Sequence, residues 1–398
     1  MSNKKNILIL CSDNYDKQPR VLRTIEALKT DYAIMVAGYS DSQLHQLNFT
    51  DLAPNLLKNK TQNWHFNKPF FIRLLVSFYY KFIKQKQFSK TLYYESQYWN
   101  NARKADLVTL QKIPFDIIIS HGVDMLPMAI KLANHKVPVI FNAHEYYPLE
   151  FEQDKIWLKT EGAKSSYIID KYLPKCTKMF CVSENIQKEY QKKCKIDSVV
   201  ITNATKYIDL KINKTNSIIK IIHHGAAIRA RQIELMIEMM NYLSNDFILH
   251  LMLTPSDPNY LAELKKLHNS NNRIEFIDPV NVAEIPQICN QYDIGLFILP
   301  PVNFNWVNAL PNKLFEFIQA RLSIAVSPNS DMKYLVEKYN LGVVSDDYSP
   351  ESMAKKIMTL TPTAIDKYKL NSHNYAMELS AEENQKKILE IVNAQFLN

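Results

Sequence analysis

The chain contains 398 residues, 46% of them hydrophobic and 22% charged, which is typical of a folded globular protein rather than a disordered one. This length exceeds one ordinary domain and predicts two or three. The formal net charge is +8, and only six glycines occur, where average usage would give roughly 28. Because no two glycines lie close together, the sequence excludes the glycine-rich phosphate loops of dinucleotide-binding and P-loop proteins.

The cysteines and the apolar runs indicate the compartment. The five cysteines form no C-x-x-C pair and have no histidine at ligand spacing, so we expect no zinc site. Their odd number favours a reducing environment. No stretch approaches the ~18 uninterrupted apolar residues of a membrane-spanning helix. We therefore expect a cytoplasmic protein, and peripheral binding at the inner face of the plasma membrane stays open.

The N-terminal half alternates short apolar runs with amphipathic stretches. A helix is predicted to begin at Pro19, and another to cover 125–133. The expected strands are 6–11, 32–37, 116–120, 137–142, 179–182 and 198–202. Continuous Ile- and Val-rich strands that are separated by helices indicate a parallel sheet covered on both faces.

A polar stretch at 203–217 interrupts this pattern and predicts a linker, after which the alternation starts again. Helices are expected at 231–243, 310–320 and 332–338. The expected strands are 218–223, 248–253, 274–276, 294–298, 323–326 and 342–344. The sequence thus predicts an α/β fold of two Rossmann-like, doubly wound parallel sheets that face each other across a cleft.

Residues 56–104 carry the basicity of the whole chain. They contain ten basic residues and one acidic residue, a net +9 that leaves −1 for the rest. In a helix over 70–84, Arg73, Lys81 and Lys84 would form one stripe, with apolar side chains over most of the remaining surface. Such a helix suits an anionic membrane surface, and the alternative is an insertion packed on the first domain. This local charge argues against a nucleic-acid partner.

Ligands of open parallel sheets bind beyond the carboxyl ends of the strands, so the residues there are candidates. His144 follows the strand 137–142 and could bind a sugar hydroxyl, or instead cap the next helix. Gly225 ends the strand at 218–223, and Arg231 follows six residues later. A small residue, a helix N-terminus and an arginine together suit a diphosphate.

The segment NALPNKLFEF contains the strongest group of candidates. Pro311 is expected in the first turn of a helix, which places Asn312 and Lys313 at its positively polarised start. Glu316 follows Lys313 by three residues, on the same side of the helix. The lysine could meet a phosphate and the carboxylate could accept from both hydroxyls of a ribose. The alternative is an ordinary surface salt bridge.

The stretch LPNKLFEFIQARLSIAVSPNSDMKYLVEKYNLGVVSDD resembles the donor-site signature of GT-B glycosyltransferases, particularly the retaining family 4 type. Other segments resemble the same family in the expected order. They are PRVLRTIEAL, FDIIISHG, VPVIFNAHEYYP, CVSENIQKEY, VVITNA, IIHHGAAIRARQIELMIE and YDIGLFILPP. Together these segments cover most of the chain except the basic insertion.

The resemblance implies an acceptor domain over 1–205, a nucleotide-sugar domain over 216–373, and a helix over 374–398 that crosses back to the first domain. It implies a role for each candidate residue. Arg231 and Lys313 would hold the diphosphate, Glu316 the ribose and His144 the donor sugar; Gly225, Asn308 and Asn312 would complete the donor site, and Arg20 and Arg23 would lie on the acceptor side. Asn308 stands where the family has the first glutamate of its E-x7-E motif, so the usual carboxylate is missing.

The implied function is transfer of a sugar, with retention, from a nucleotide-diphosphate sugar to a surface polysaccharide or lipid-linked glycan. The nucleotide sugar would be a co-substrate. No D-x-D motif occurs, so we expect neither a metal nor another cofactor. Two alternatives remain: a nucleotide-sugar 2-epimerase of the same architecture, and a non-catalytic nucleotide-sugar-binding protein, which Asn308 would suit.

Overall fold

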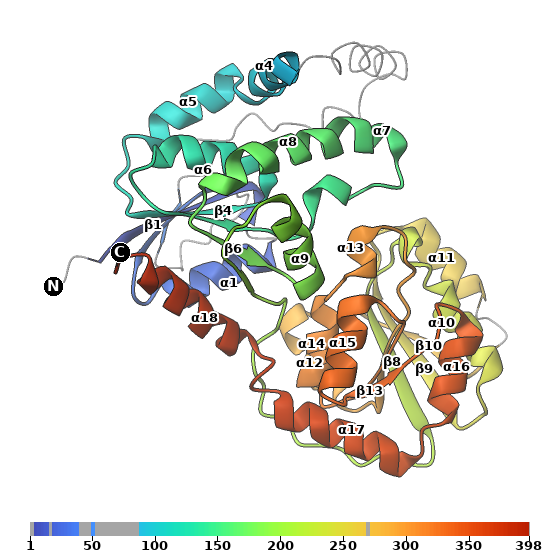
Figure 1. Ribbon diagram of the computed structural model, residues 1–398. Helices are drawn as coiled ribbons and strands as arrows, with labels where there is room; N and C mark the ends of the chain where they lie inside the picture. The colour runs from blue at the N-terminus through green and yellow to red at the C-terminus, as the bar shows by residue number, and fades with distance from the viewer. Residues whose placement is uncertain (1–3, 16–17, 40–48, 52–86, 268–270, 398) are drawn as a thin grey trace. The chain divides into compact units, whose positions relative to one another are not determined.

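The computed structural model describes residues 4–15, 18–39, 49–51, 87–267 and 271–397 and divides into two compact units (Figure 1). The N-terminal unit comprises Met1–Ile201 and Gln385–Asn398, and the C-terminal unit comprises Thr202–Asn384. Each unit contains one sheet whose strands all pair in parallel. The prediction of an α/β fold with two Rossmann-like sheets is confirmed.

The sheet of the N-terminal unit has the order β3-β2-β1-β4-β5-β6-β7. Its strands are β1 Asn6–Asn14, β2 Ala33–Tyr39, β3 Phe49–Asp51, β4 Ile117–His121, β5 Val139–Asn142, β6 Lys178–Cys181 and β7 Ser198–Val200. Every residue of β4 and β5 is buried, as continuous apolar strands require when helices cover both faces. The short edge strand β3 was not expected, because its three residues carry no apolar run.

Helices of this unit surround the central strands. They are α1 Pro19–Leu28, α4 Gln87–Tyr98, α5 Asn101–Leu110, α6 Leu126–Ala133, α7 Lys155–Trp157, α8 Ala163–Tyr172, α9 Glu184–Lys193 and, across the unit boundary, α18 Ala381–Ala394. The last part of α18 belongs to the core, because its Ile388 and Val392 are buried with residues of β1 and α1. The C-terminal residues therefore complete the N-terminal unit.

The sheet of the C-terminal unit has the order β10-β9-β8-β11-β12-β13. Its strands are β8 Ile219–Ala226, β9 Phe247–Thr254, β10 Ile274–Ile277, β11 Ile294–Phe297, β12 Ser323–Val326 and β13 Gly342–Val344. Its helices are α10 Glu234–Met239, α11 Pro258–Leu267, α12 Ile285–Cys289, α13 Phe304–Val307, α14 Asn312–Gln319, α15 Ser330–Lys338, α16 Pro350–Met358 and α17 Pro362–Tyr375. The helix expected over 231–243 begins only at Glu234 and ends in a 3-10 turn, Met240–Tyr242. Its start is later than predicted because Gln232, with a φ of +48°, separates an earlier 3-10 turn, Arg229–Arg231, from α10.

Gly295 brings α14 close to the sheet. A Cβ atom at this position would lie 2.4 Å from Cγ of Phe317, so the aromatic ring occupies the space where any other residue would have a side chain. Phe317 is fully buried, and burial of a side chain of this size contributes about 2 kcal/mol. This contact fixes the helix that carries Lys313 and Glu316.

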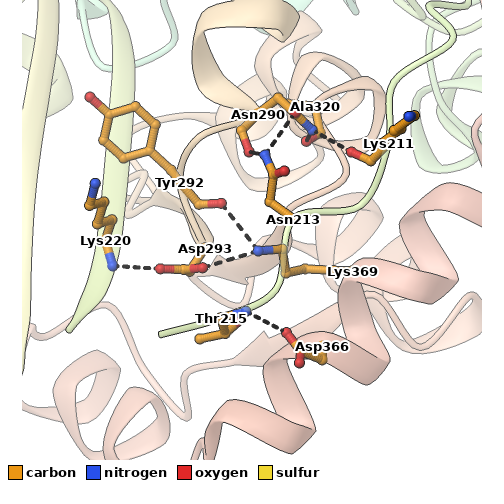
Figure 2. A network of polar contacts seen from close by, with 10 residues as sticks. All are labelled: Lys211, Asn213, Thr215, Lys220, Asn290, Tyr292, Asp293, Ala320, Asp366 and Lys369. Carbon is orange, nitrogen blue, oxygen red and sulfur yellow. Dashed lines mark hydrogen bonds and ion pairs between the residues drawn. The ribbon is translucent and has the colours of Figure 1, made fainter. Parts of the chain in front are cut away.

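A buried polar network joins α17 to the sheet (Figure 2). Nζ of Lys369 donates to Asp293 over 3.0 Å, and the two side chains are 1% and 8% exposed. The second carboxylate oxygen of Asp293 accepts from the backbone N–H of Lys220 at the start of β8. The ion pair is thus hydrogen-bonded at both ends, which offsets the cost of removing its charges from water.

Residues 202–215, most of the predicted linker, belong to the C-terminal unit. Backbone N–H groups of this segment donate to side chains of that unit, from Tyr207 to Glu382 and from Thr215 to Asp366. Asn213 donates to the backbone and side-chain oxygens of Asn290 (Figure 2). The boundary between the units therefore lies at residues 201–202, directly before the predicted linker at 203–217.

The helix expected over 70–84, with Arg73, Lys81 and Lys84, lies outside the described residues. The described part of the insertion packs on the N-terminal unit: Glu95 of α4 accepts from Tyr172 and Lys171 of α8, over 2.6 and 2.8 Å. Tyr94 stacks on Tyr167 of the same helix. For residues 91–104, this favours the interpretation of a packed insertion.

Candidate functional site

The carboxyl end of β8 brings together three of the predicted residues. Gly225 has a φ of +136°, a conformation that other residues adopt only under strain. A Cβ at this position would lie 3.2 Å from Nζ of Lys313 and 3.6 Å from Nη1 of Arg231. The missing side chain therefore leaves room for two cationic groups, one from α14 and one from the turn after β8.

Lys313 is only 7% exposed, and its Nζ lies 3.7 Å from the centroid of the Phe297 ring. Burial lowers the pKa of this amine well below its ordinary value, the charge of Arg231 lowers it further, and Glu316 opposes both effects. Lys313 and the partly buried Arg231 repel each other, and the burial of a charge such as that of Lys313 is expensive without a counter-charge. The arrangement is thus suited to an anion that approaches Gly225.

Arg231 stands at the end of the 3-10 turn rather than in a helix. Its Nη1 donates to the carbonyl of Ala226 over 3.3 Å, which directs the guanidinium back toward the strand end. Burial lowers the pKa of Arg231 from its ordinary value. A guanidinium has five N–H donors, so further donors remain for a bound oxyanion.

Glu316 lies one helical turn beyond Lys313 and is 5% exposed. The alternative of a surface salt bridge is therefore wrong, because both side chains are buried. One oxygen of the carboxylate, Oε2, lies 3.4 Å from Nε2 of His224. Burial, together with the charge of Lys313, lowers the pKa of His224 to about 3, so this ring is neutral and leaves the carboxylate its charge. The sequence contains a signal for His224, since it directly precedes Gly225, but only the structure pairs it with Glu316.

Asn308 and Asn312 flank the start of α14. Asn308 is 7% exposed and its amide donates to the carbonyl of Phe304 over 2.9 Å. Asn312 is the first residue of α14, and Pro311 precedes it as the N-cap in an extended conformation. The expectation that Pro311 lies in the first helical turn is therefore wrong by one position.

In the N-terminal unit, His144 lies two residues beyond the end of β5. Its Nε2 is 3.0 Å from Nδ1 of His121, the last residue of β4. Burial, followed by the charge of Arg20, lowers the pKa of His144 to about 3. The sequence marked His121 only as a strand-end residue, and its contact with His144 follows from the parallel pairing of β4 with β5.

Arg20 and Arg23, the predicted acceptor-side residues, lie on α1. Arg20 is 7% exposed; its Nε donates to Asn142 over 2.7 Å and its Nη1 to the carbonyl of Ile201 over 2.9 Å. Burial and the charge of Arg23 lower the pKa of Arg20 to about 10. These contacts give Arg20 a role in supporting the strand ends, while Arg23 is the more accessible of the two.

Glu145 is the other ionisable group beside His144. Burial raises the pKa of its carboxyl to about 7, the opposite of what a neighbouring cation would do. Its backbone carbonyl accepts from the hydroxyl of Tyr190 over 2.8 Å. The residue is therefore fixed at the strand end by its backbone and has a carboxyl that titrates near neutral pH.

The described residues contain neither a metal-binding cluster nor a membrane span. In the part of the chain that the structure describes, no three His, Cys, Asp or Glu side chains are grouped as a metal site would need. Among the same residues, no helix is both long enough and apolar enough to cross a bilayer.

Known proteins share both the sequence pattern and the fold of this chain. Residues 70–206 match the family model of Glycosyltransferase Family 4. No curated protein matches the sequence. Among solved structures, a glycosyltransferase from Rickettsia africae is similar, with a TM-score of 0.69 and 15% identity over all of both chains.

Two further solved structures are similar over nearly their whole length. HepE of Anabaena in complex with UDP-glucose has a TM-score of 0.66 and 13% identity, and the match covers 98% of this chain and 99% of that one. Sucrose-phosphate synthase from Thermosynechococcus elongatus has a TM-score of 0.67 and 11% identity, with coverage of 99% and 100%. At such low identity these structures establish the fold, and the predicted resemblance to family 4-like GT-B glycosyltransferases is confirmed.

Proposed function

We propose that this family 4-like glycosyltransferase with the GT-B fold transfers a sugar from a nucleotide-diphosphate donor to a surface polysaccharide or lipid-linked glycan, with retention of configuration. The observation that carries the proposal is the convergence of Lys313 and Arg231 on Gly225. A diphosphate would supply counter-charge to the buried Lys313 and to the partly buried Arg231. HepE of Anabaena, which has the same fold, forms a complex with UDP-glucose, and this supports a UDP-sugar as the first donor to test.

The catalytic role of the two cations follows from where negative charge develops during the reaction. As the bond between the anomeric carbon and the phosphate oxygen breaks, negative charge grows on the leaving diphosphate. Lys313 and Arg231 stabilise that charge at the carboxyl end of β8. The acceptor hydroxyl forms the new bond to the anomeric carbon, and its proton passes to the leaving diphosphate. No protein side chain has to become covalently attached.

Glu316 would bind the donor at its ribose. A carboxylate accepts two hydrogen bonds at once, and the two vicinal hydroxyls of a ribose present two donors. The ring of His224, which is neutral, lies 3.4 Å from one oxygen of this carboxylate. Asn312 and Asn308 complete the donor site in this proposal, with the amide of Asn308 in place of the family's first glutamate.

The acceptor and the membrane are further parts of the proposal. We assign the acceptor side to the N-terminal unit, with Arg23 as the accessible cation and Arg20 as its support. The basic segment 56–104 would bring the enzyme to an anionic membrane surface. Binding to vesicles of phosphatidylglycerol that is lost on replacing Arg73, Lys81 and Lys84 by Glu supports this; equal binding by both proteins overturns it.

The donor is tested by thermal shift and calorimetry with UDP-, GDP- and dTDP-sugars, followed by hydrolysis and transfer assays. We expect one nucleotide class to bind, and Glu316→Gln to weaken its binding by about tenfold through the loss of charge-assisted hydrogen bonds. The 2′-deoxy nucleotide should bind the parent protein about as weakly as the ribonucleotide binds the variant.

The same assays distinguish the proposed transferase from the two alternative functions. Binding with neither hydrolysis nor transfer would favour a non-catalytic protein, for which the amide of Asn308 is the structural argument. Release of a free epimerised sugar without any acceptor would favour a 2-epimerase. Binding of none of the nucleotide sugars would contradict the assignment of the donor site.

A further inference from the structure

Two histidines of the N-terminal unit share one hydrogen bond. Nδ1 of His121 lies 3.0 Å from Nε2 of His144, and the rings meet edge-on. His121 is 1% exposed, whereas His144 is only partly buried and is therefore the ring within reach of a ligand. The pair comes from neighbouring strands, because His121 of β4 pairs in register with Asn142 of β5.

Both rings are neutral. The pKa of His121 is lowered well below its ordinary value by burial, then by His144 and by Arg20, and the pKa of His144 is lowered to about 3 by burial and by Arg20. A neutral imidazole has one N–H and one lone pair. One ring must therefore donate and the other accept, and the direction decides which nitrogen of His144 carries its proton.

The remaining nitrogen of His121 distinguishes the two directions. Its Nε2 is buried and has no hydrogen-bond partner among the described residues. If His144 donated, that Nε2 would have to carry a buried N–H without an acceptor, and such orphaned donors are rarer than unsatisfied acceptors. The positive charge of Arg20 acts on the same ring and favours a lone pair over a further N–H.

We propose that His121 donates its Nδ1 proton to Nε2 of His144 and so holds His144 in the Nδ1–H tautomer. His121 is then a positioning residue, since it acts on a ligand only through His144. Resting on the proposed function, the inference also assigns chemistry: His144 offers an N–H to an oxygen of a bound sugar. It is a hydrogen-bond donor and not a base, because its other nitrogen already accepts from His121.

The first test measures the tautomer without any turnover. Long-range proton–nitrogen spectra of the full-length protein labelled with ¹⁵N-histidine, at pH 7, distinguish the two tautomers, and His144→Gln identifies the signals of His144. We expect the Nδ1–H pattern in the parent protein. The Nε2–H pattern for His144 would overturn the proposal, and this spectrum is decisive even if every variant of His121 fails to fold.

Two nearly isosteric variants of His121 then provide opposite controls. In His121→Asn the amide nitrogen stands near the place of Nδ1 and still donates, so the Nδ1–H tautomer should persist. In His121→Asp a carboxylate accepts instead, and His144 should change to the Nε2–H tautomer. A merely structural role would make the two variants alike, so identical spectra for both overturn the proposal.

Turnover with the nucleotide sugar identified in the screen tests the chemical consequence. We expect His121→Asn to keep kcat within about threefold and His121→Asp to lower kcat by about tenfold or more, the effect of losing one aligned donor. Full activity of His121→Asp in spite of a reversed tautomer overturns the role toward the sugar. If the three proteins show the expected tautomers of His144 but the parent transfers no sugar, the result would count against the proposed function alone.

Discussion

The two units use the same backbone feature and place different charges beside it. In the C-terminal unit His224 precedes Gly225, and in the N-terminal unit His121 precedes Gly122; both glycines have positive φ angles, +136° and +83°. Lys313 lies beside the first glycine, whereas the neutral His144 contacts the residue before the second. One glycine therefore has a lysine amine beside it, and the histidine before the other is hydrogen-bonded to a second, neutral histidine.

The difference teaches that the surroundings of a buried cation indicate function more clearly than strand-end position does. Both sites lie at the carboxyl ends of parallel strands, so topology alone would rank them equally. Both sites keep a buried cation, but Arg20 donates to Asn142 and to the carbonyl of Ile201. Lys313 lies instead beside a second cation, Arg231, and this costs stability. A cost of that kind is expected where a ligand later supplies the missing charge.

Removal of the Lys313 charge should have the largest effect on the difference between the two sites. In Lys313→Met we expect nucleotide affinity to fall about 100-fold, close to 3 kcal/mol, since a charge-assisted contact with phosphate is lost. The free energy of unfolding without ligand should rise by about 1 kcal/mol, because an unfavourable buried charge disappears. Calorimetry with the nucleotide and chemical denaturation measure the two quantities.

The matched control for Lys313 is Lys333→Met on α15, where the lysine side chain is 50% exposed. Neither affinity nor stability should change there beyond measurement error. Unaltered nucleotide affinity in Lys313→Met would remove this residue from the site.

Substitution of Gly122 and of Gly225 tests whether the positive φ angle has the same role in both units. Alanine at either position should cost about 1–3 kcal/mol of stability through backbone strain. Only Gly225→Ala should also weaken nucleotide binding, by about tenfold, because its Cβ would lie 3.2 Å from Nζ of Lys313. At Gly122 the nearest atom would be Oη of Tyr147 at 3.6 Å, an ordinary contact. Equal losses of affinity in both variants would show that strain, and not the cations, controls binding.

The raised pKa of Glu145 should be visible in the pH dependence of stability. Its carboxyl has a pKa of about 7 in the folded state, above the ordinary 4.5, so the unfolded chain releases this proton first as pH rises. Glu145 therefore lowers the free energy of unfolding by up to about 1.4 kcal/mol per pH unit between pH 4.5 and 7.

In Glu145→Gln this loss should disappear, so the stability difference between variant and parent should grow with pH and level off above about pH 7. Urea denaturation at several pH values measures it. The lowered pKa of His144 makes stability rise with pH below the ordinary value of 6.5, opposite to the effect of Glu145. Subtracting the parent's free energy of unfolding from that of the variant removes this contribution. A difference that does not vary with pH would contradict the raised pKa.

Prediction from the sequence was most successful for features that depend on the periodicity of apolar residues and on the order of short motifs along the chain. The central strands and the helix of Lys313 and Glu316 follow from continuous apolar runs and from the segment PNKLFE. It could not place Glu316 next to His224, because that contact joins residues 92 positions apart through β8 and α14. It also missed the break at Gln232, whose left-handed conformation has no glycine to signal it. The buried state of Arg20 depends on Asn142 and Ile201, which only the assembled sheet brings near.

The division of the chain has a consequence for the order in which the protein matures. The C-terminal unit is one continuous segment, Thr202–Asn384, whereas the N-terminal unit also needs Gln385–Asn398. Ile388 and Val392 fill its core, and the hydroxyl of Tyr32 donates to Asn393. During synthesis, the half of the protein made first therefore stays unfinished until the half made second has left the ribosome. A stop codon after residue 384 would leave the C-terminal unit complete and expose the core of the N-terminal unit to proteolysis.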